Sequence, residues 1–145
     1  ALYPPAGSRG VGYARSNMYG KRFDELVVKT DNVLFVAQIE SIEAVHNLDE
    51  ILLVNHLDAI IVGPYDLSAS MGLTGQFAHP KYLEILASIK KKSQENKIPM
   101  GIHVVQPHQE RLQRTIDEGY QFIAYSIDAV FLYNAAQCPS TSLPK

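Results

Sequence analysis

The chain has 145 residues, of which 46% are hydrophobic and 19% charged, and its formal net charge is -2. This length suffices for one domain with a real core and is too short for two ordinary domains. The near-neutral charge balance gives no reason to expect nucleic acid as a partner. No apolar run reaches the length of a membrane span, and we expect neither a membrane span nor a signal peptide.

The first part of the chain predicts a loop followed by the start of an alternating pattern. Residues 1–20 are rich in Gly, Pro, Tyr and Arg and have no clean period, which is typical of a long loop. Residues 18–30 are weakly helical. Residues 33–39 (VLFVAQI) form the near-continuous apolar run of a strand buried on both faces. Residues 41–54 predict a helix with Ser41 as its N-cap.

The remainder continues the alternation of strands and helices. Short apolar runs predict three further strands at residues 59–62, 98–105 and 122–125. Helical spacing predicts helices that open at Pro80, with Tyr82, Ile85, Leu86 and Ile89 on one face, near Pro107 and at Asp128. Residues 65–79 predict a polar, Gly-bearing loop, and residues 139–145 a frayed tail.

Four strands that alternate with four helices predict a parallel sheet with right-handed crossovers. Two architectures fit this order, namely an open doubly wound sheet and half of a (β/α)8 barrel, and the pattern alone does not separate them. The sequence contains no Gly-rich phosphate loop of the dinucleotide or P-loop type, which counts against a nucleotide-binding sheet.

Polar residues end the first two strands, where sites gather in folds of this kind. Gln38 and Glu40 are two apart and project to the same side, whereas Ile39 projects to the other. Asp66 follows the next strand, one βα repeat later. If the two strands are neighbours, both carboxylates sit at the same edge of the sheet.

Two such acids either share a proton or hold a cation between them. Two carboxylates that leave room for water and for a substrate's oxygens suit Mg²⁺ or Mn²⁺ better than Zn²⁺. The alternative is that Glu40 caps the following helix and Asp66 caps a turn. The serines of residues 66–72 (DLSASMG) add a turn that either points backbone N–H groups at an anion or is an ordinary capped turn.

Four motifs together resemble the HpcH/HpaI aldolase family, the class II 2-oxo-acid aldolases. They are YPPAGSRGVG, VAQIES, GPYDLSASMG and GIHVV, which run in order through nearly the whole chain, and the two central motifs are the specific ones. The resemblance implies a (β/α)8 barrel of which residues 1–145 form a single, incomplete domain. The chain would hold strands five to eight, with residues 1–20 as the loop before strand five.

The resemblance also implies a site and a reaction. Glu40 and Asp66 would be the protein ligands of a divalent metal, which would act as a Lewis acid on the ketone of pyruvate and stabilise its enolate. The backbone N–H groups of Tyr65 and Asp66 would bind the pyruvate carboxylate, and Gln38 would orient the substrate. The enolate would add to an aldehyde, and the reverse reaction would cleave a 4-hydroxy-2-oxo acid.

The chain departs from the family pattern in what it lacks. The family's catalytic His and strand-borne Arg belong to the first half of the barrel, and no histidine here matches by position. His103, in the predicted third strand, either contacts the aldehyde or is a packed histidine. Tyr65 replaces a residue that is often small, which should alter the shape of the pocket more than the mechanism.

Other readings remain open at this point. Relatives of the fold carry out citrate-synthase-like or acyl-CoA lyase condensations, and a non-catalytic half-barrel could assemble with a separate chain. An incomplete barrel leaves two sheet edges and a core face uncovered, so we expect self-association, a partner half or marginal stability, and we predict a homo-oligomer. The single cysteine, Cys138, cannot form an internal disulfide, which favours a cytoplasmic location.

Overall fold

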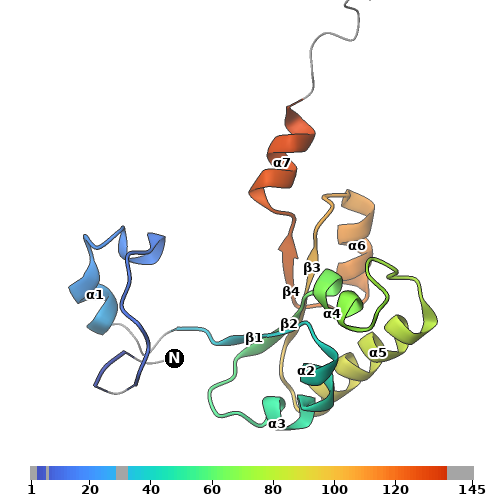
Figure 1. Cartoon of the computed structure of the whole chain (residues 1–145), viewed down its shortest axis with the longest axis horizontal. Coiled ribbons are helices and arrows are strands. Elements are labelled where there is room, and N and C mark those ends of the chain that lie inside the picture. Colours follow the sequence, from blue (N-terminus) through green and yellow to red (C-terminus); the bar gives the residue numbers. More distant parts are fainter. Residues whose placement is uncertain (1–2, 6, 29–32, 137–145) are drawn as a thin grey trace, which may run out of the picture. The chain divides into compact units, whose positions relative to one another are not determined.

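The computed structural model describes residues 3–5, 7–28 and 33–136 (Figure 1). The chain divides into two compact units, Ala1–Phe35 and Val36–Lys145. The tail at residues 139–145 and Cys138 lie outside the described residues. That the whole chain forms one incomplete domain stays a prediction.

A 3₁₀ turn, η1 (Arg15–Asn17), precedes a short helix, α1 (Phe23–Val28), in the first unit. Asn17 is 1% exposed and organises this turn. Its side-chain oxygen accepts hydrogen bonds from the backbone N–H groups of Ala14 and Gly20, both at 3.0 Å. Residues 14–20, the last part of the segment predicted as a loop, are therefore held in a defined turn by one buried amide.

The helix predicted over residues 18–30 begins only at Phe23. Met18 and Tyr19 have φ values of 50° and 53°, which lie in the left-handed region that a right-handed helix cannot contain. Residues 29–32 lie outside the described part of the chain, so the predicted helical end at Thr30 cannot be compared.

A parallel four-stranded sheet in the order β1-β2-β3-β4 forms the second unit. Its strands are β1 (Val36–Ile39), β2 (Ala59–Val62), β3 (Met100–Val104) and β4 (Phe122–Tyr125). Its helices are α2 (Ile42–His46), α3 (Leu48–Leu52), α4 (Pro64–Ser70), α5 (Pro80–Glu95), α6 (Gln109–Asp117) and α7 (Asp128–Ala135). The predicted alternation and the parallel sheet are confirmed.

The strands begin where a neighbouring strand is available to pair with them. β1 starts at Val36, which pairs with Ala59, the first residue of β2. Residues 33–35 were expected in the same strand, but they precede the first paired position and are exposed. β3 likewise starts at Met100 and not at Ile98. The predicted bounds of β4 are confirmed.

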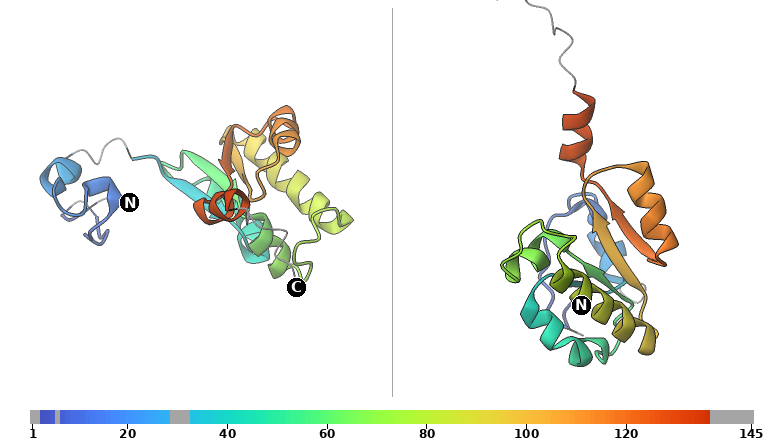
Figure 2. Two further views of the ribbon diagram at one scale, coloured as in Figure 1. Left: turned by 90° about the horizontal axis from the view of Figure 1, so that it is seen from above. Right: turned by 90° about the vertical axis from the view of Figure 1, so that its right-hand side faces the viewer.

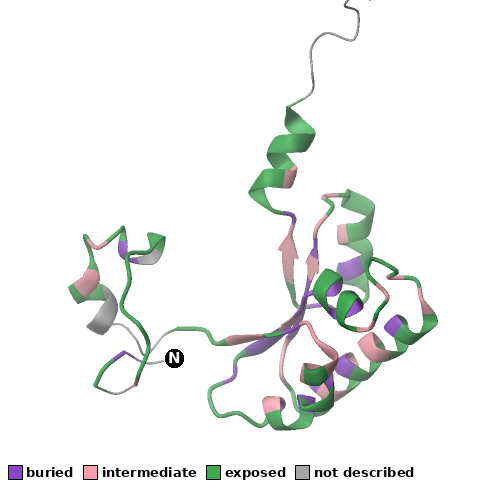
Figure 3. Ribbon diagram, viewed as in Figure 1, coloured by how far each residue is buried: buried purple, intermediate pink, exposed green. Residues whose placement is uncertain are grey.

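One face of the sheet carries the hydrophobic core. Figure 3 marks the buried residues of the strands and helices in purple. Alternate strand residues such as Ile39, Ile60 and Val104 are at most 2% exposed. They pack with buried side chains of α3, α4 and α5, among which are Leu48, Leu52, Leu67, Tyr82 and Ile89. Burial of these apolar side chains is the main stabilising contribution to the unit, and it fixes the helices to this side of the sheet.

The opposite face of the sheet is less buried than the core face. Gln38, His103 and Phe122 occupy its alternate positions, and Gln38 and Phe122 are exposed. Phe122 leans over Gly101, where an added Cβ would lie 2.5 Å from the Phe122 carbonyl oxygen. A sheet in sequential order with its core on one face matches half of a (β/α)8 barrel, whereas a doubly wound sheet has helices on both faces.

The helices differ from the prediction in two places. The single helix expected over residues 41–54 is split into α2 and α3 at Asn47, whose φ and ψ of -93° and 11° interrupt the α-helix. The Ser41 cap is confirmed, because its hydroxyl accepts a hydrogen bond from the Ala44 N–H at 3.1 Å.

The second difference is α4, which occupies the start of the segment predicted as a loop. Pro64 stands at the first position of this helix, where its fixed φ favours helix formation and its missing N–H costs nothing. Leu67, at 0% exposed, anchors α4 to the core. Further views of the second unit show α4 at the same end of the sheet as the start of α2 (Figure 2).

Candidate active site

Glu40 stands directly after β1 and is held by its neighbour on the same face. Gln38 Nε2 donates a hydrogen bond to Glu40 Oε2 at 2.6 Å. Ile39 is 1% exposed and points into the core on the other face, as the alternation predicts. Glu40 itself is half-buried. The amide therefore fixes one carboxylate oxygen and leaves the other available to a ligand.

Gly63 brings the end of β2 against this carboxylate. Its N–H donates to the Ile39 carbonyl at 3.1 Å, which ties the two strand ends together. A Cβ at this position would lie 3.2 Å from Gln38 Nε2, from Glu40 Cβ and from Glu40 Oε2. Glycine is thus the residue that lets the Glu40 side chain lie close to the turn that starts α4. The sequence alone does not indicate this role for Gly63, for which its place directly after a strand is the available signal.

Asp66 lies in the first turn of α4 and is exposed. Because β1 and β2 are neighbours, Glu40 and Asp66 follow the carboxyl ends of adjacent strands, which meets the condition set by the sequence. The Asp66 carboxylate has no hydrogen-bond or ion-pair partner among the described residues. The Leu67 N–H is the first to bond within the helix, to the Gly63 carbonyl at 2.9 Å. The N–H groups of Tyr65 and Asp66 precede it and take no intrahelical acceptor.

The serines of α4 hold the backbone in place. Ser68 donates to the Tyr65 carbonyl at 2.9 Å and accepts from the Gly75 N–H at 3.1 Å. Ser70 accepts from the Ile42 N–H at 3.0 Å, which joins α4 to the start of α2. Both hydroxyls are therefore engaged in fixing the turns after β1 and β2, a role that the sequence did not reveal for Ser70.

His103 lies on the same sheet face as Gln38 but toward the other edge. It is half-buried on β3, and its Nε2 lies 3.3 Å from the Ser126 carbonyl oxygen. Of the two alternatives for His103, this contact fits a packed histidine. Its contact with an aldehyde stays a prediction. The other histidine with a described side-chain bond is His79, whose Nδ1 accepts from the Lys81 N–H at 3.2 Å and caps α5.

Two adjoining cavities open beside the carboxyl ends of β2 and β3. The smaller, of about 30 Å³, is lined by Pro64, Tyr65, Phe77, His103, Val105, Gln106 and Arg111. The larger, of about 620 Å³, runs along α5 and α6 and shares Pro64, Phe77, His103 and Arg111 with the smaller one. Neither Phe77 nor Arg111 was singled out from the sequence, because nothing local indicates that they meet.

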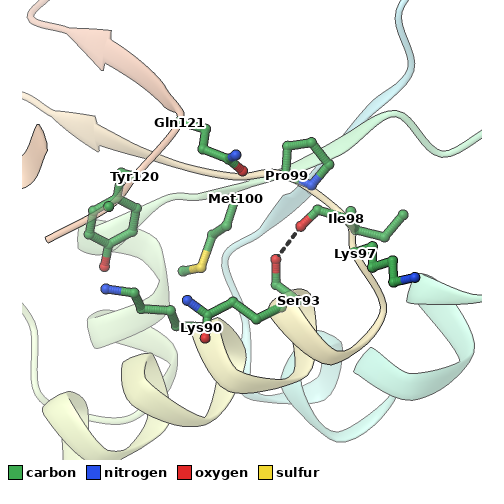
Figure 4. A pocket seen from close by; sticks show the side chains of 10 residues that line it. Lys90, Ser93, Lys97, Ile98, Pro99, Met100, Tyr120 and Gln121 are labelled. Atoms are coloured by element: carbon green, nitrogen blue, oxygen red, sulfur yellow. Dashed lines mark hydrogen bonds between the residues drawn. The ribbon is translucent and has the colours of Figure 1, made fainter.

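A third cavity, of about 380 Å³, lies at the other end of the sheet (Figure 4). Met100, the first residue of β3, forms part of its wall, together with Lys90, Ser93 and Tyr120. Burial raises the pKa of the Tyr120 hydroxyl to about 12, and Glu118 and Tyr82 act in the same direction. This cavity lies at the amino ends of the strands, whereas Glu40 and Asp66 lie at the carboxyl ends.

Within the described residues, no group of three or more His, Cys, Asp or Glu side chains could hold a metal ion. A site made by Glu40 and Asp66 alone has fewer protein ligands than such a group. In the same part of the chain, no helix has the length and apolar character needed to cross a membrane.

Comparison with known proteins identifies the family. The sequence model described as "HpcH/HpaI aldolase/citrate lyase" matches residues 1–135. The chain belongs to this family. It is 34% identical over 138 residues to the hydroxypyruvate/pyruvate aldolase of Roseobacter denitrificans, covering 93% of this chain and 53% of that protein. It is also 34% identical to the 4-hydroxy-2-oxo-heptane-1,7-dioate aldolase of Escherichia coli, over 93% of this chain and 52% of that one.

Solved structures agree with the fold. A crystal structure of a family protein from Burkholderia cenocepacia matches with a TM-score of 0.73 and 28% identity, over 92% of this chain and 53% of the other. The HpcH/HpaI aldolase of Desulfitobacterium hafniense matches with a TM-score of 0.69 and 30% identity, over 92% and 52%. The chain thus spans about half the length of its relatives, and its fold is the C-terminal half of a (β/α)8 barrel.

Proposed function

We propose that the full-length protein is a divalent-metal-dependent aldolase that reversibly cleaves 4-hydroxy-2-oxo acids to pyruvate and an aldehyde. The observation that carries this proposal is the placement of Glu40, whose carboxylate is held by Gln38 and lies against Gly63 at the start of the helix that bears Asp66. The names of the two aldolase relatives support a carbon–carbon lyase that acts on 2-oxo acids.

Glu40 and Asp66 fit a hard divalent cation. Both offer carboxylate oxygens, and each keeps at least one oxygen without a protein partner among the described residues. Oxygen ligands with positions left for water and substrate suit Mg²⁺ or Mn²⁺. When bound, the cation supplies a Lewis acid that polarises the ketone of the substrate and eases loss of a methyl proton.

The neighbouring groups would bind and orient the 2-oxo acid. The backbone N–H groups of Tyr65 and Asp66 are available to the substrate carboxylate, and charge-assisted bonds of this kind are the strong ones. Gln38 would orient the substrate with the part of its amide that does not bond to Glu40. The proton-moving His and Arg of the family are expected in the first half of the barrel. We further propose a cytoplasmic homo-oligomer, in line with the single cysteine and the exposed sheet face.

The test is exchange of pyruvate methyl protons into heavy water, followed by NMR on the full-length protein with and without Mg²⁺ or Mn²⁺. We expect exchange that depends on the metal and is lost in Glu40→Ala and in Asp66→Ala. Proton exchange at the same rate with and without the metal would refute the proposed mechanism. Full exchange in both variants would remove the metal assignment.

A matched control is Glu43→Ala. Glu43 is an exposed acid in the first turn of α2, three residues beyond Glu40 and away from β1. Its removal deletes the same charge from the same region, so exchange should stay within about twofold of the wild type. Loss of exchange in this control would mean that net charge, and not ligation by Glu40, explains the first result.

A further inference from the structure

Arg111 lies at the junction of the two cavities beside the carboxyl ends of β2 and β3. It stands in the first turn of α6 and lines both the small cavity and the larger groove. Tyr65, which directly precedes Asp66, forms another wall of the small cavity. Asp66 of the proposed metal site is therefore the direct sequence neighbour of a residue that lines the same small cavity as Arg111.

A row of aromatic rings positions the Arg111 guanidinium. Tyr65 meets Phe77 edge to face with ring centroids 4.9 Å apart, and Phe77 lies 5.7 Å from the ring of Tyr82. Arg111 Cζ sits over the Phe77 ring, 5.8 Å from its centroid, within the range of a cation–π contact. Ring contacts thus run without a break from Tyr65, in the turn that would bind the substrate carboxylate, to the exposed guanidinium of Arg111.

The charge of Arg111 is not neutralised by the protein. The ion pairs among the described residues involve Arg22, Lys91 and Lys92, and none involves Arg111. Glu110, which directly precedes Arg111 in the sequence, lines the larger groove but forms no ion pair with Arg111. Burial raises the pKa of the Tyr82 hydroxyl, and the positive charge of Arg111 offsets part of this rise.

We propose that Arg111 is a specificity-determining residue that selects acceptor aldehydes carrying a carboxylate. This inference rests on the proposed function and names the acceptor class of the same site. The guanidinium offers a planar set of donors that a carboxylate can accept in pairs. The small cavity holds about one water molecule or the edge of a carboxylate, so the anionic end of the acceptor binds there while its aldehyde points to the donor.

The experiment compares two acceptors of similar length, succinate semialdehyde and the neutral butanal, in the aldol direction with the full-length protein. Arg111→Gln should lower kcat/KM for succinate semialdehyde by about ten- to a hundredfold, and leave that for butanal within about twofold. Arg111→Lys keeps the charge and should recover part of the preference. Phe77→Leu removes the ring beneath the guanidinium and should weaken the preference by a few-fold.

Arg114→Gln is the matched control. Arg114 lies on the same helix and lines the larger groove, but not the small cavity. It should leave the ratio of the two acceptors within twofold of the wild type. A ratio that Arg111→Gln does not change, or an equal loss for both acceptors, would overturn the assignment.

Pyruvate proton exchange separates this inference from the proposed function. Exchange does not need an acceptor, so it should be unchanged in Arg111→Gln. If the wild type shows no metal-dependent exchange, the proposed function fails. If exchange is intact and the acceptor ratio does not respond to Arg111, only the acceptor assignment fails.

Discussion

The two ends of the sheet use their polar groups in different ways. At the carboxyl end, Glu40 keeps one oxygen without a protein partner, and Asp66 has no described partner at all. At the amino end, the Lys90 ammonium bonds to the Glu118 carbonyl and lies 5.3 Å from the centroid of the Tyr120 ring. Lys90 at the amino end is thus occupied in holding the fold, whereas the two carboxylates at the carboxyl end keep oxygens that have no partner among the described residues.

Gly101→Ala tests the structural character of β3 and has the largest expected effect on stability. The added Cβ would lie 2.5 Å from the Phe122 carbonyl oxygen and 2.7 Å from its ring. Since the backbone of β4 cannot move away without breaking the sheet, we expect a loss of about 3 kcal/mol in the free energy of unfolding. Denaturant unfolding measures it, and an unchanged midpoint would contradict the close packing of β3 on β4.

Gly63→Ala applies the same change at the carboxyl end and should act on activity instead. Its Cβ would lie 3.2 Å from side-chain atoms of Gln38 and Glu40, which can shift by a few tenths of an ångström. We expect stability to change by less than about 1 kcal/mol and metal-dependent exchange to fall about tenfold, because the carboxylate that we propose as a metal ligand is displaced. Wild-type exchange together with a large loss of stability would contradict this prediction, because Gly63 would then act on the fold and not on the site.

Ser93→Ala probes a hydrogen bond at the amino end. Ser93 is 1% exposed, and its hydroxyl donates to the Ile98 carbonyl in the turn between α5 and β3. Loss of this buried donor should lower the free energy of unfolding by about 1–2 kcal/mol, with exchange activity unchanged after correction for folded protein. A specific loss of exchange would show that the amino end also takes part in function.

Tyr120→Phe has the smallest expected effect and concerns pH. Burial, assisted by Glu118 and Tyr82, raises the pKa of Tyr120 in the folded protein to about 12, above the value of about 10 for an exposed tyrosine. The unfolded chain then loses its proton first, so stability is retained below pH 10 and falls as the pH rises toward 12. Urea unfolding between pH 9 and 12 should show a smaller decline in the variant, and an identical decline would remove Tyr120 as the cause.

Much of the fold could be predicted because it depends on local patterns. Short apolar runs identified the strands, and the bounds of β4 were correct, since buried parallel strands differ strongly from the amphipathic helices between them. The helix α4 was missed because Gly63-Pro64 and two serines are typical of turns. What overrode that tendency was Leu67, whose burial could be seen only once the helices were packed on the sheet.

The placement of the candidate site residues was also only partly predictable. The alternation of Gln38 and Glu40, and the neighbouring strand that leads to Asp66, followed from the pleat and the βα repeat. The fit of Gly63 against Glu40 could not be predicted, because it depends on the register of β1 and β2. The meeting of Phe77 with Arg111 is likewise a tertiary contact between distant segments, for which no local pattern exists.

The central claim, that Glu40 and Asp66 together hold a divalent metal, is tested most directly by Mn²⁺ binding measured with electron paramagnetic resonance on the full-length protein. We predict that Glu40→Gln and Asp66→Asn each weaken Mn²⁺ binding at least about tenfold, while Glu43→Gln binds like the wild type. Wild-type affinity in either of the first two variants would contradict it.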